Sequence, residues 1–294
     1  MKDVAVILVG LNANKFVKEC IETVEKADWS RHTCEIIYVD NGSKDGSVEM
    51  VRSCFPGVRV IANDSNLGYC KAANQGARIA DARHFYFLND DTIVYPDALP
   101  VVIDFLDSQP GIGVVGSRLL NLDLTDQWSG RRFPSVWNGI LGRRSWLSRL
   151  FPNARALTDY LYRDEVAAGV PFEADWVSAA ALLVDRDTFA RAGMFAEDYY
   201  YWHEAVFCDR VRRAGRKVYL HPGSKIIHYE GKGSGARPYP VQRWHILDFH
   251  RGAYRCAVEH YNLGRFNPAR WLTAAALATR AMVLLAVVRF TSPR

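Results

Sequence analysis

The chain lacks several features that would place it in a specialised class of protein. Its 294 residues include only six cysteines, which are scattered and form no Cys-x-x-Cys pair. This spacing argues against a zinc site or a disulfide framework and suits a reducing cytosol. There is also no internal repeat, no low-complexity segment and no signal-peptide cleavage site after the first apolar run. We therefore expect a globular, cytoplasmic protein.

A large excess of one charge is missing too. Lysine and arginine number 37 against 32 aspartates and glutamates, which gives a formal net charge of +5. So small an excess does not by itself predict binding to nucleic acid. Hydrophobic residues make up 49% and charged residues 23% of the chain, which is typical of a folded protein. The length suffices for one large α/β domain, alone or with an appendage.

Three short apolar runs end abruptly in polar residues. The runs at residues 4–9, 35–39 and 85–88 have the length of buried strands, and stretches with helical patterns separate them. This alternation predicts an α/β fold in which the carboxyl ends of the strands form a ligand-binding edge. The polar residues that follow the three runs are Asn12, Asp40, Asn89, Asp90 and Asp91.

The Asn89-Asp90-Asp91 sequence has the composition of a cation site. Two adjacent carboxylates and an amide oxygen can hold a hard divalent cation and leave other positions open for substrate phosphates. A solvated turn after the strand is the alternative, because Asn and Asp favour turns. Three polar strand ends together favour binding over turn chemistry alone.

Several motifs in one order resemble a known family. They occupy residues 39–47, 66–69, 73–76, 88–92, 176–184 and 193–215, and His228 follows them. This order resembles the family-2 inverting glycosyltransferases with the GT-A fold, and most of all their bacterial rhamnosyltransferase-like members. The resemblance covers roughly residues 3–262, and the motifs are specific jointly rather than singly.

The resemblance implies a fold and a division of the chain. A GT-A fold is a Rossmann-like mixed sheet flanked by helices. We expect this domain at residues 1–240, with a nucleotide-binding half at 1–100 and an acceptor half at 101–240. Residues 241–294 would form a helical appendage that can associate with a membrane.

The resemblance also implies roles at the nucleotide end of the site. Asp40 would bind the nucleobase, with Asn12 on the neighbouring loop. Lys71 and Asn74 would lie near the sugar diphosphate. The donor would be a nucleoside-diphosphate sugar.

A metal site follows from the same resemblance. Asn89 and Asp91 would form a modified Asp-x-Asp element, with Asp91 on the metal and Asn89 near the ribose and the metal. Asp90, between them, is grouped with the nucleotide-binding residues, although it can also point away. His228 would complete the metal or diphosphate site, unless it is a surface histidine at a strand end. The implied cofactor is a divalent metal, Mn or Mg.

The general base is the point at which the sequence departs from the family pattern. The stretch before the Arg-Ala-Gly motif is one residue short of the commonest spacing. Alignment from its carboxyl end places Glu204 at the base position, and alignment from its amino end places Ala205 there. We prefer Glu204. Asp198, as a loop residue, and Asp209, as an exposed helix residue, are the alternatives.

Two segments indicate a membrane surface. Residues 131–149 contain five arginines, two tryptophans and no acidic residue, a composition that suits phosphates, anionic headgroups or a solvated loop. Residues 271–290 are strongly apolar but contain Arg280, whose insertion would cost roughly 2.5–3.5 kcal/mol. We therefore prefer an interfacial helix to a spanning one. A helix packed on the domain or on a second subunit is the alternative.

These interpretations combine into one expected function. The protein would transfer a sugar, possibly rhamnose, to a lipid-linked or polysaccharide acceptor with inversion, at the inner face of the cell membrane. Because the base is ambiguous, a catalytically silent sugar-nucleotide-binding or scaffold protein is the alternative. We expect no nucleic acid partner, and a homo-oligomer is possible.

Overall fold

The predicted strands form the parallel half of one large sheet. The computed structural model describes residues 1–133, 160–229 and 238–291, and all residue-level statements below refer to these. Strands β1 (Lys2–Gly10), β2 (Cys34–Asp40) and β4 (Ala82–Asn89) contain the three apolar runs. β1 pairs in parallel with both β2 and β4, and β2 pairs in parallel with β3 (Arg59–Ala62).

The second half of the sheet is mixed. The order across the sheet is β3-β2-β1-β4-β10-β6-β11-β5, and β8 pairs with β11. β10 is antiparallel to β4 and β6, whereas β11 is parallel to β6 and antiparallel to β5. The bounds are β5 Thr92–Val94, β6 Ile112–Leu120, β8 Phe172–Glu173, β10 Ala181–Asp185 and β11 Lys217–His228. A separate small sheet pairs β7 (Gly130–Arg131) with β9 (Trp176–Val177).

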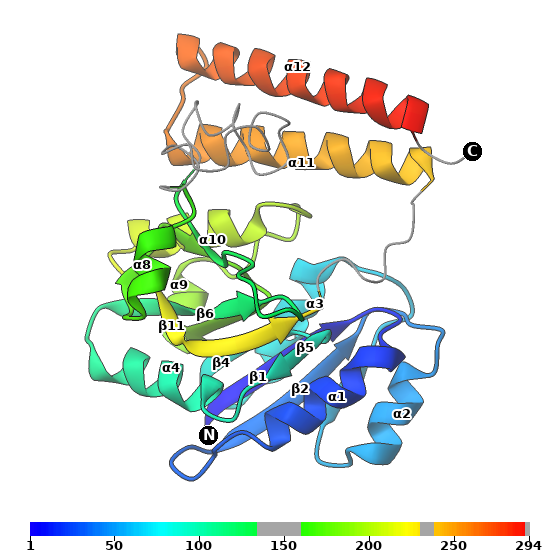
Figure 1. The fold of residues 1–294 in the computed structure, drawn as a ribbon, viewed down its shortest axis with the longest axis vertical. Helices are drawn as coiled ribbons and strands as arrows, with labels where there is room; N and C mark the ends of the chain where they lie inside the picture. Colours follow the sequence, from blue (N-terminus) through cyan, green and yellow to red (C-terminus); the bar gives the residue numbers. More distant parts are fainter. Residues whose placement is uncertain (134–159, 230–237, 292–294) are drawn as a thin grey trace.

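Helices cover both faces of the large sheet (Figure 1). Alternate residues of β1 face opposite layers, as the period of two in a strand requires. Val4, Val6 and Leu8 pack with α1, α2 and α4, and Ala5 and Ile7 pack with the layer that includes α3, α9 and α10. The bounds are α1 Asn14–Glu25, α2 Ser47–Cys54, α3 Tyr69–Ile79, α4 Ala98–Ser108, α8 Arg163–Ala168, α9 Arg186–Arg191 and α10 His203–Arg213.

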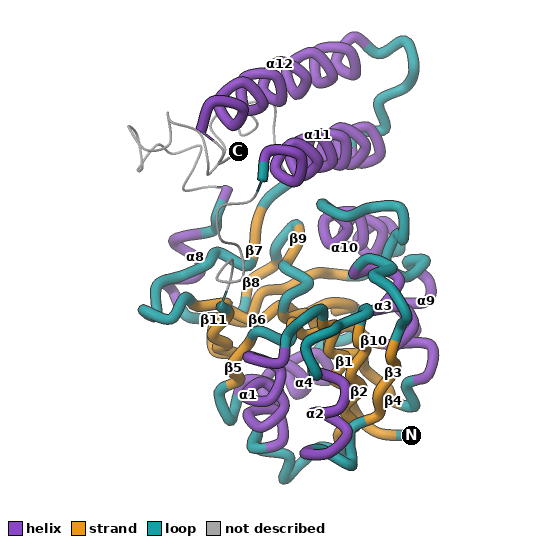
Figure 2. Tube along the Cα trace, turned by 90° about the vertical axis from the view of Figure 1, so that its right-hand side faces the viewer, coloured by secondary structure: helices purple, strands orange, loops and turns teal. Residues whose placement is uncertain are grey.

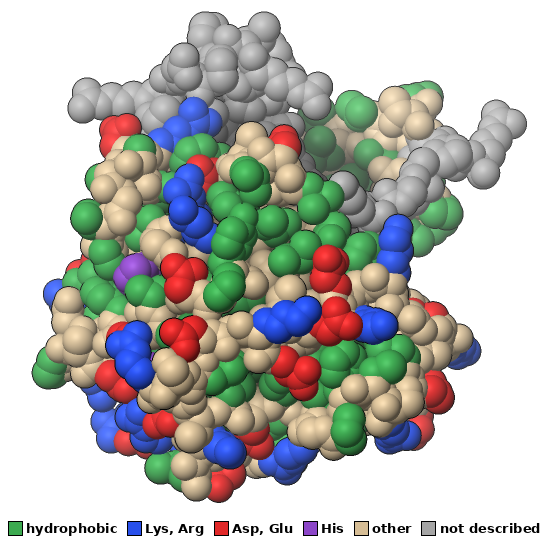
Figure 3. Space-filling model, turned by 60° about the horizontal axis from the view of Figure 1, so that its bottom comes forward, with side chains coloured by type: hydrophobic (Ala, Val, Ile, Leu, Met, Phe, Trp, Pro, Cys, Tyr) green, Lys and Arg blue, Asp and Glu red, His purple; other side chains and the backbone are tan. Residues whose placement is uncertain are grey.

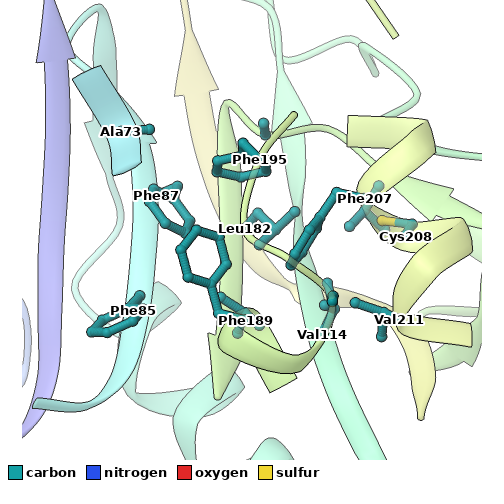
Figure 4. Packing of buried hydrophobic residues seen from close by; sticks show 14 of the residues in the cluster. Ala73, Phe85, Phe87, Val114, Leu182, Phe189, Phe195, Phe207, Cys208 and Val211 are labelled. Carbon is teal, nitrogen blue, oxygen red and sulfur yellow. The ribbon is translucent and has the colours of Figure 1, made fainter. Parts of the chain in front are cut away.

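Aromatic rings fill the layer between β4, β10, α9 and α10 (Figure 4). Phe87 lies 4.7 Å from Phe195 and 5.0 Å from Phe189, measured between ring centroids. Phe195 in turn lies 5.0 Å from Phe207 of α10. Offset and edge contacts of this kind add to the stabilisation from burial. They fix the start of α10 relative to the end of β4.

The carboxyl-terminal region is a helical hairpin at one end of the molecule. Helix α11 (Tyr239–His260) lies against α10, and α12 (Pro268–Thr291) lies beside α11 on its outer side (Figures 1 and 2). Ala281 is the one buried residue of α12. α12 packs on α11, which in turn packs on α10, and the alternatives of packing on the domain or on a second subunit stay predictions.

The predicted fold class, a GT-A-type mixed sheet flanked by helices with a helical appendage, is confirmed. The proposed boundaries at residues 100 and 240 stay predictions, although α11 begins at Tyr239. Most of the arginine-rich segment 131–149 lies outside the described residues. On the face shown in Figure 3, basic and acidic side chains are interspersed, without a continuous patch of one sign.

Candidate active site

The carboxyl ends of β1, β2 and β4 lie next to one another. Gly10 is in register with Asp40, and Val9 is in register with Asn89. The polar residues after the three strands therefore share one edge of the sheet, as the sequence predicted. This is the edge at which open α/β sheets bind ligands.

Asn12 and Asp40 belong to one hydrogen-bonded loop pair. Asp40 is buried, and its Oδ2 accepts hydrogen bonds from the backbone amides of Gly42 (3.1 Å) and Ser43 (2.8 Å). The Asn12 amide donates to Ser43 Oγ at 2.7 Å, and Asn12 Oδ1 accepts from the Lys44 amide at 3.0 Å. The structure thus brings together the two residues assigned to the nucleobase and holds their loops rigidly.

Asp90 lies beneath this edge. A Cβ atom at Gly10 would be 2.3 Å from Asp90 Oδ2 and 2.4 Å from the Tyr38 hydroxyl, so glycine is required there. Asp90 Oδ2 is buried and has no hydrogen-bond partner among the described residues. Burial and the charge of Asp91 raise the pKa of Asp90 well above its usual value. The side chain therefore points into the protein, which differs from the predicted contact with the nucleotide.

His228 joins the end of β11 to the end of β4. Its Nε2 atom lies 3.2 Å from Asn89 Nδ2 and 3.2 Å from Asp91 Oδ1. His228 is buried rather than exposed at the surface, so the alternative of a surface histidine is wrong. The structure assembles the three residues that the resemblance assigns to the metal end of the site.

Gln127 fixes the orientation of His228, and the sequence analysis did not identify it. Gln127 Nε2 donates to the His228 backbone carbonyl at 2.7 Å and to Asn121 Oδ1 at 3.0 Å. Because both partners there are acceptors, Gln127 Oε1 is left to accept from His228 Nδ1 at 2.8 Å. The proton then sits on Nδ1, and the Nε2 lone pair faces Asn89 and Asp91. A histidine held in this way is oriented to bind a metal.

Lys71 and Asn74 lie on α3 but face different surroundings. Lys71 is exposed. Asn74 is buried, and its amide donates to the Phe195 carbonyl at 2.9 Å and to Glu197 Oε1 at 3.1 Å. Asn74 Oδ1 accepts from the Phe195 amide at 3.2 Å. Asn74 therefore anchors the segment before α10, which differs from the predicted contact with the diphosphate.

Glu204 lies in the first turn of α10 with one unpaired oxygen. Its side chain is 20% exposed. His203 Nδ1 is 3.3 Å from Glu204 Oε2 but lies closer, at 3.1 Å, to the Tyr200 carbonyl. We take the carbonyl as the partner of that nitrogen, since Glu204 Oε2 is buried without a hydrogen bond within the described ranges. Buried carboxylate oxygens normally accept hydrogen bonds. An oxygen without one is free to accept a proton from a substrate, as a general base does.

Ala205 lies in a different environment. Its exposure is 0%, and it belongs to the core layer with Val206, Phe207 and Cys208. A carboxylate introduced there would enter the apolar core rather than the site. Glu204 therefore stays the preferred position for the base.

The segment before β10 connects Glu204 to the metal end of the site. The Asn89 amide donates to the Ala180 carbonyl at 3.0 Å, and the Tyr69 hydroxyl donates to the Ala179 carbonyl at 3.0 Å. The Tyr69 ring lies 5.1 Å from the ring of His203, which precedes Glu204. The base candidate and the Asn89–Asp91 edge are thus held against one short loop.

The two alternative bases have other partners. Asp198 is exposed and forms an ion pair with Arg255. Asp209 is buried, in contrast to the exposed position predicted for it, and it accepts from Arg213 Nε at 2.7 Å and His260 Nδ1 at 2.8 Å. Burial alone would raise the pKa of Asp209, but these hydrogen bonds outweigh it and lower the pKa. Both carboxylates connect α11 to the catalytic domain.

The donor set at the sheet edge fits a divalent cation that also binds substrate. Across the described parts of the chain, no three His, Cys, Asp or Glu side chains are grouped to hold a metal ion without help. Asp91 and His228 can supply two ligands, because Asp91 Oδ1 and His228 Nε2 lie 3.2 Å apart and can both reach one cation. The carboxylate and the phosphate oxygens of a substrate suit a hard divalent cation, whereas the imidazole nitrogen is a ligand more typical of transition metals.

Comparison with known sequences adds a family match and two relatives. The model of the family described as "Glycosyl transferase family 2" matches residues 5–173. N-acetylglucosaminyl-diphospho-decaprenol L-rhamnosyltransferase of Mycobacterium tuberculosis is 26% identical over 262 residues, which cover 85% of this chain and 83% of that protein. Undecaprenyl-phosphate 4-deoxy-4-formamido-L-arabinose transferase of Edwardsiella ictaluri is 29% identical over 145 residues, covering 48% of this chain and 43% of the relative.

Solved structures share the fold. The mannosyltransferase PcManGT of Pyrobaculum calidifontis, in complex with GDP-Man and Mn²⁺, aligns with a TM-score of 0.60 at 19% identity and covers 97% of this chain and 79% of its own. GalNAc-T7 with UDP, GalNAc and Mn²⁺ aligns with a TM-score of 0.60 at 16% identity, covering 83% and 47% respectively. At these identities the likeness shows the fold alone.

Proposed function

Because the chain belongs to glycosyl transferase family 2 and is a glycosyltransferase, we propose that it transfers a sugar, possibly rhamnose, from a nucleoside diphosphate to a lipid-linked or polysaccharide acceptor with inversion. The observation that carries this proposal is the cluster of Asn89, Asp91 and His228 beside the Asn12–Asp40 loops. The rhamnosyltransferase relative, whose name contains a diphospho-decaprenol, supports the lipid-linked acceptor.

At the donor end, the residues of the chain bind and orient the leaving group. The Asn12 and Asp40 loops would receive the nucleoside, and Lys71 would lie near the diphosphate. Asp91 and His228 would hold a Mn or Mg ion. When bound, that ion neutralises the charge that grows on the departing diphosphate. Two structural relatives carry Mn²⁺, which supports this cofactor.

At the acceptor end, Glu204 would act as general base. Its carboxylate takes the proton of the acceptor hydroxyl while that oxygen bonds to the anomeric carbon of the sugar. The bond from that carbon to the diphosphate oxygen breaks, and the bonding pair leaves with the diphosphate. Because attack and departure occur on opposite faces, the anomeric configuration inverts. The buried free oxygen of Glu204 supports this role.

The hairpin would dock the enzyme on the inner face of the cell membrane. By length and composition, α12 is long and apolar enough to cross a membrane. The exposed outer side of α12 carries large apolar residues, namely Trp271, Leu272, Met282, Val283, Val287 and Phe290. Arg280 turns inward, with its guanidinium 5.9 Å from the Phe249 ring of α11 and 3.4 Å from His250 Nε2. The central arginine therefore contacts α11 and leaves the outer side apolar.

Peripheral docking suits this hairpin better than spanning. α11 carries Arg243, Asp248, Arg251 and Glu259 on its surface and packs along α12. A spanning α12 would have to leave α11 or draw these charges into the bilayer, which is costly. An α12 lying at the interface keeps both contacts and buries its apolar side.

A donor screen tests the proposed function. Nucleoside-diphosphate sugars are titrated by calorimetry into the full chain with Mn or Mg and with chelator. We expect one donor to bind only with metal, and NMR of the product to show an inverted anomeric centre. Binding without transfer to any acceptor would favour the silent sugar-nucleotide-binding protein instead.

A further inference from the structure

A cavity outside the donor edge lies between α11 and the segment that leads into α10. Its volume is about 140 Å³. Residues 198–201, which lead into α10, form one wall, and Asp248, Arg251, Gly252 and Arg255 of α11 form the other. These four follow the i, i+3, i+4, i+7 spacing of one helix face. None of the lining residues belongs to the edge formed by β1, β2 and β4.

Gly252 allows the two walls to meet. A Cβ atom at this position would lie 3.0 Å from the Tyr201 carbonyl oxygen and 3.1 Å from the Trp202 ring. Tyr201 and Trp202 also bond to α11, through His245 Nδ1 at 2.9 Å and the Phe249 carbonyl at 3.1 Å. The cavity is therefore formed by fixed elements of the fold.

The polar groups of the cavity divide into a paired set and a free set. Arg255 forms an ion pair with Asp198 and lies 4.0 Å over the Tyr199 ring. Asp248 and Arg251 form no hydrogen bond or ion pair with any described residue. Tyr200 is 45% exposed. Within the described residues, the Arg251 guanidinium, the Asp248 carboxylate and the Tyr200 ring thus remain available to a ligand.

This chemistry fits a sugar better than a phosphate. Sugar hydroxyls both donate and accept hydrogen bonds, and a carboxylate with a guanidinium satisfies both functions. A phosphate would require an excess of positive charge, but two aspartates balance the two arginines here. The volume is also below the several hundred Å³ of sites for larger ligands. It suits one sugar unit rather than a whole nucleotide sugar.

One wall of the cavity belongs to the segment that leads into Glu204. This position favours the sugar of the acceptor over the sugar of the donor. The Tyr200 carbonyl in the cavity wall accepts from His203 Nδ1, and Glu204 follows His203 in α10. We propose that this cavity binds the sugar of the acceptor and presents its hydroxyl to Glu204. Its other wall is α11, which packs on the apolar α12. A lipid tail attached to that sugar would extend toward the hairpin. This inference rests on the proposed function.

Transfer kinetics test the cavity. The acceptor probe is N-acetylglucosaminyl diphosphate on a short soluble prenyl chain, used with the donor found in the screen. Arg251→Ala and Asp248→Asn should each raise the KM for this acceptor about tenfold, because each loses a charged hydrogen bond. The kcat and the donor Kd should change little. Arg243→Ala, an exposed arginine of α11 outside the cavity, is the matched control.

The outcomes distinguish a failure of the cavity assignment from a failure of the proposed function. If the wild type transfers sugar and both cavity variants keep the wild-type acceptor KM, the cavity assignment is overturned while the function stands. If the wild type transfers nothing to the probe, the cavity assignment is tested by binding instead. Saturation-transfer NMR then measures the contacts of methyl N-acetylglucosaminide with the wild type and with Arg251→Ala. Contacts to this glycoside that vanish in Arg251→Ala support the cavity. Contacts unchanged in the variant, no binding, or binding of inorganic pyrophosphate instead overturn it.

Discussion

The Nε2 atom of His228 lies 3.2 Å from the Oδ1 atom of Asp91. This contact joins the last strand of the catalytic domain, β11, to the loop between β4 and β5. Gln127 Oε1 accepts a hydrogen bond from His228 Nδ1, so Nε2 is the ring nitrogen that faces Asp91. A cation bound by Nε2 and Asp91 Oδ1 would hold the ends of β11 and β4 together.

Removal of the Asp91 carboxylate should abolish the metal dependence of donor binding. We expect Asp91→Ala to bind the nucleoside diphosphate equally weakly with manganese and with chelator, because one of two protein ligands is gone. Isothermal titration measures both affinities. Asp97→Ala, which removes an exposed aspartate without a side-chain capping bond, is the control. A full metal response in Asp91→Ala would contradict the site.

Gln127 should affect metal binding, although its side chain is not itself one of the proposed metal ligands. Gln127→Ala frees the His228 ring to rotate and to change tautomer, and loss of such partners typically lowers metal affinity about 10- to 100-fold. Competition with a metal-sensitive dye would measure the change. Asn121→Ala, which removes a neighbour of Gln127 but no bond to the histidine, should have a smaller effect. Equal effects in the two variants would argue against the orienting role.

Substitutions at 204 and 205 should have different effects. Glu204→Gln keeps the shape of the side chain but cannot accept the proton, so transfer should fall by about 10² to 10⁴ with donor affinity unchanged. Ala205→Asp places a carboxylate at a position with 0% exposure, which should destabilise the fold by roughly 3–5 kcal/mol. Product formation and urea unfolding measure the two effects. Faster transfer in Ala205→Asp would restore the other alignment.

Liposome binding tests the hairpin. Deletion of residues 268–294 should release the protein from anionic vesicles and leave nucleotide binding intact, because α12 packs on α11 rather than on the catalytic domain. Val283→Glu should weaken sedimentation with vesicles, whereas Val170→Glu should not. These two valines are 59% and 60% exposed. A difference between the two variants would therefore reflect the position on α12 and not the general loss of an exposed apolar side chain. Dimers in light scattering without vesicle binding would identify a second copy as the partner of α12.

Asp209 should make part of the free energy of unfolding depend on pH. Its pKa is lowered in the folded state, whereas an unfolded aspartate titrates near about 3.9. The stabilisation is therefore complete above that value and is lost as the pH falls through the lower folded pKa. Asp209→Asn should be less stable by about 1–3 kcal/mol at neutral pH. The difference should shrink below about pH 4 in urea unfolding, and a constant difference would refute the linkage.

Local sequence patterns were enough to predict the strands and the chemistry at their ends. The apolar runs at residues 4–9, 35–39 and 85–88 could only be buried strands, and parallel pairing then placed Asp40 and Asn89 at one edge. Local composition was sufficient because burial and strand period act over a few residues. The same applies to α12, whose apolar length was plain from residues 271–290 alone.

Contacts between segments far apart in the sequence could not be predicted and depend on the folded arrangement. That Asp90 points inward depends on the space left by Gly10, and the burial of Asn74 depends on the segment at Phe195. Gln127 carried no local signal, because its role exists only where β11 ends beside it. Such roles depend on how residues far apart in the sequence pack together. A short sequence pattern contains no information about that packing.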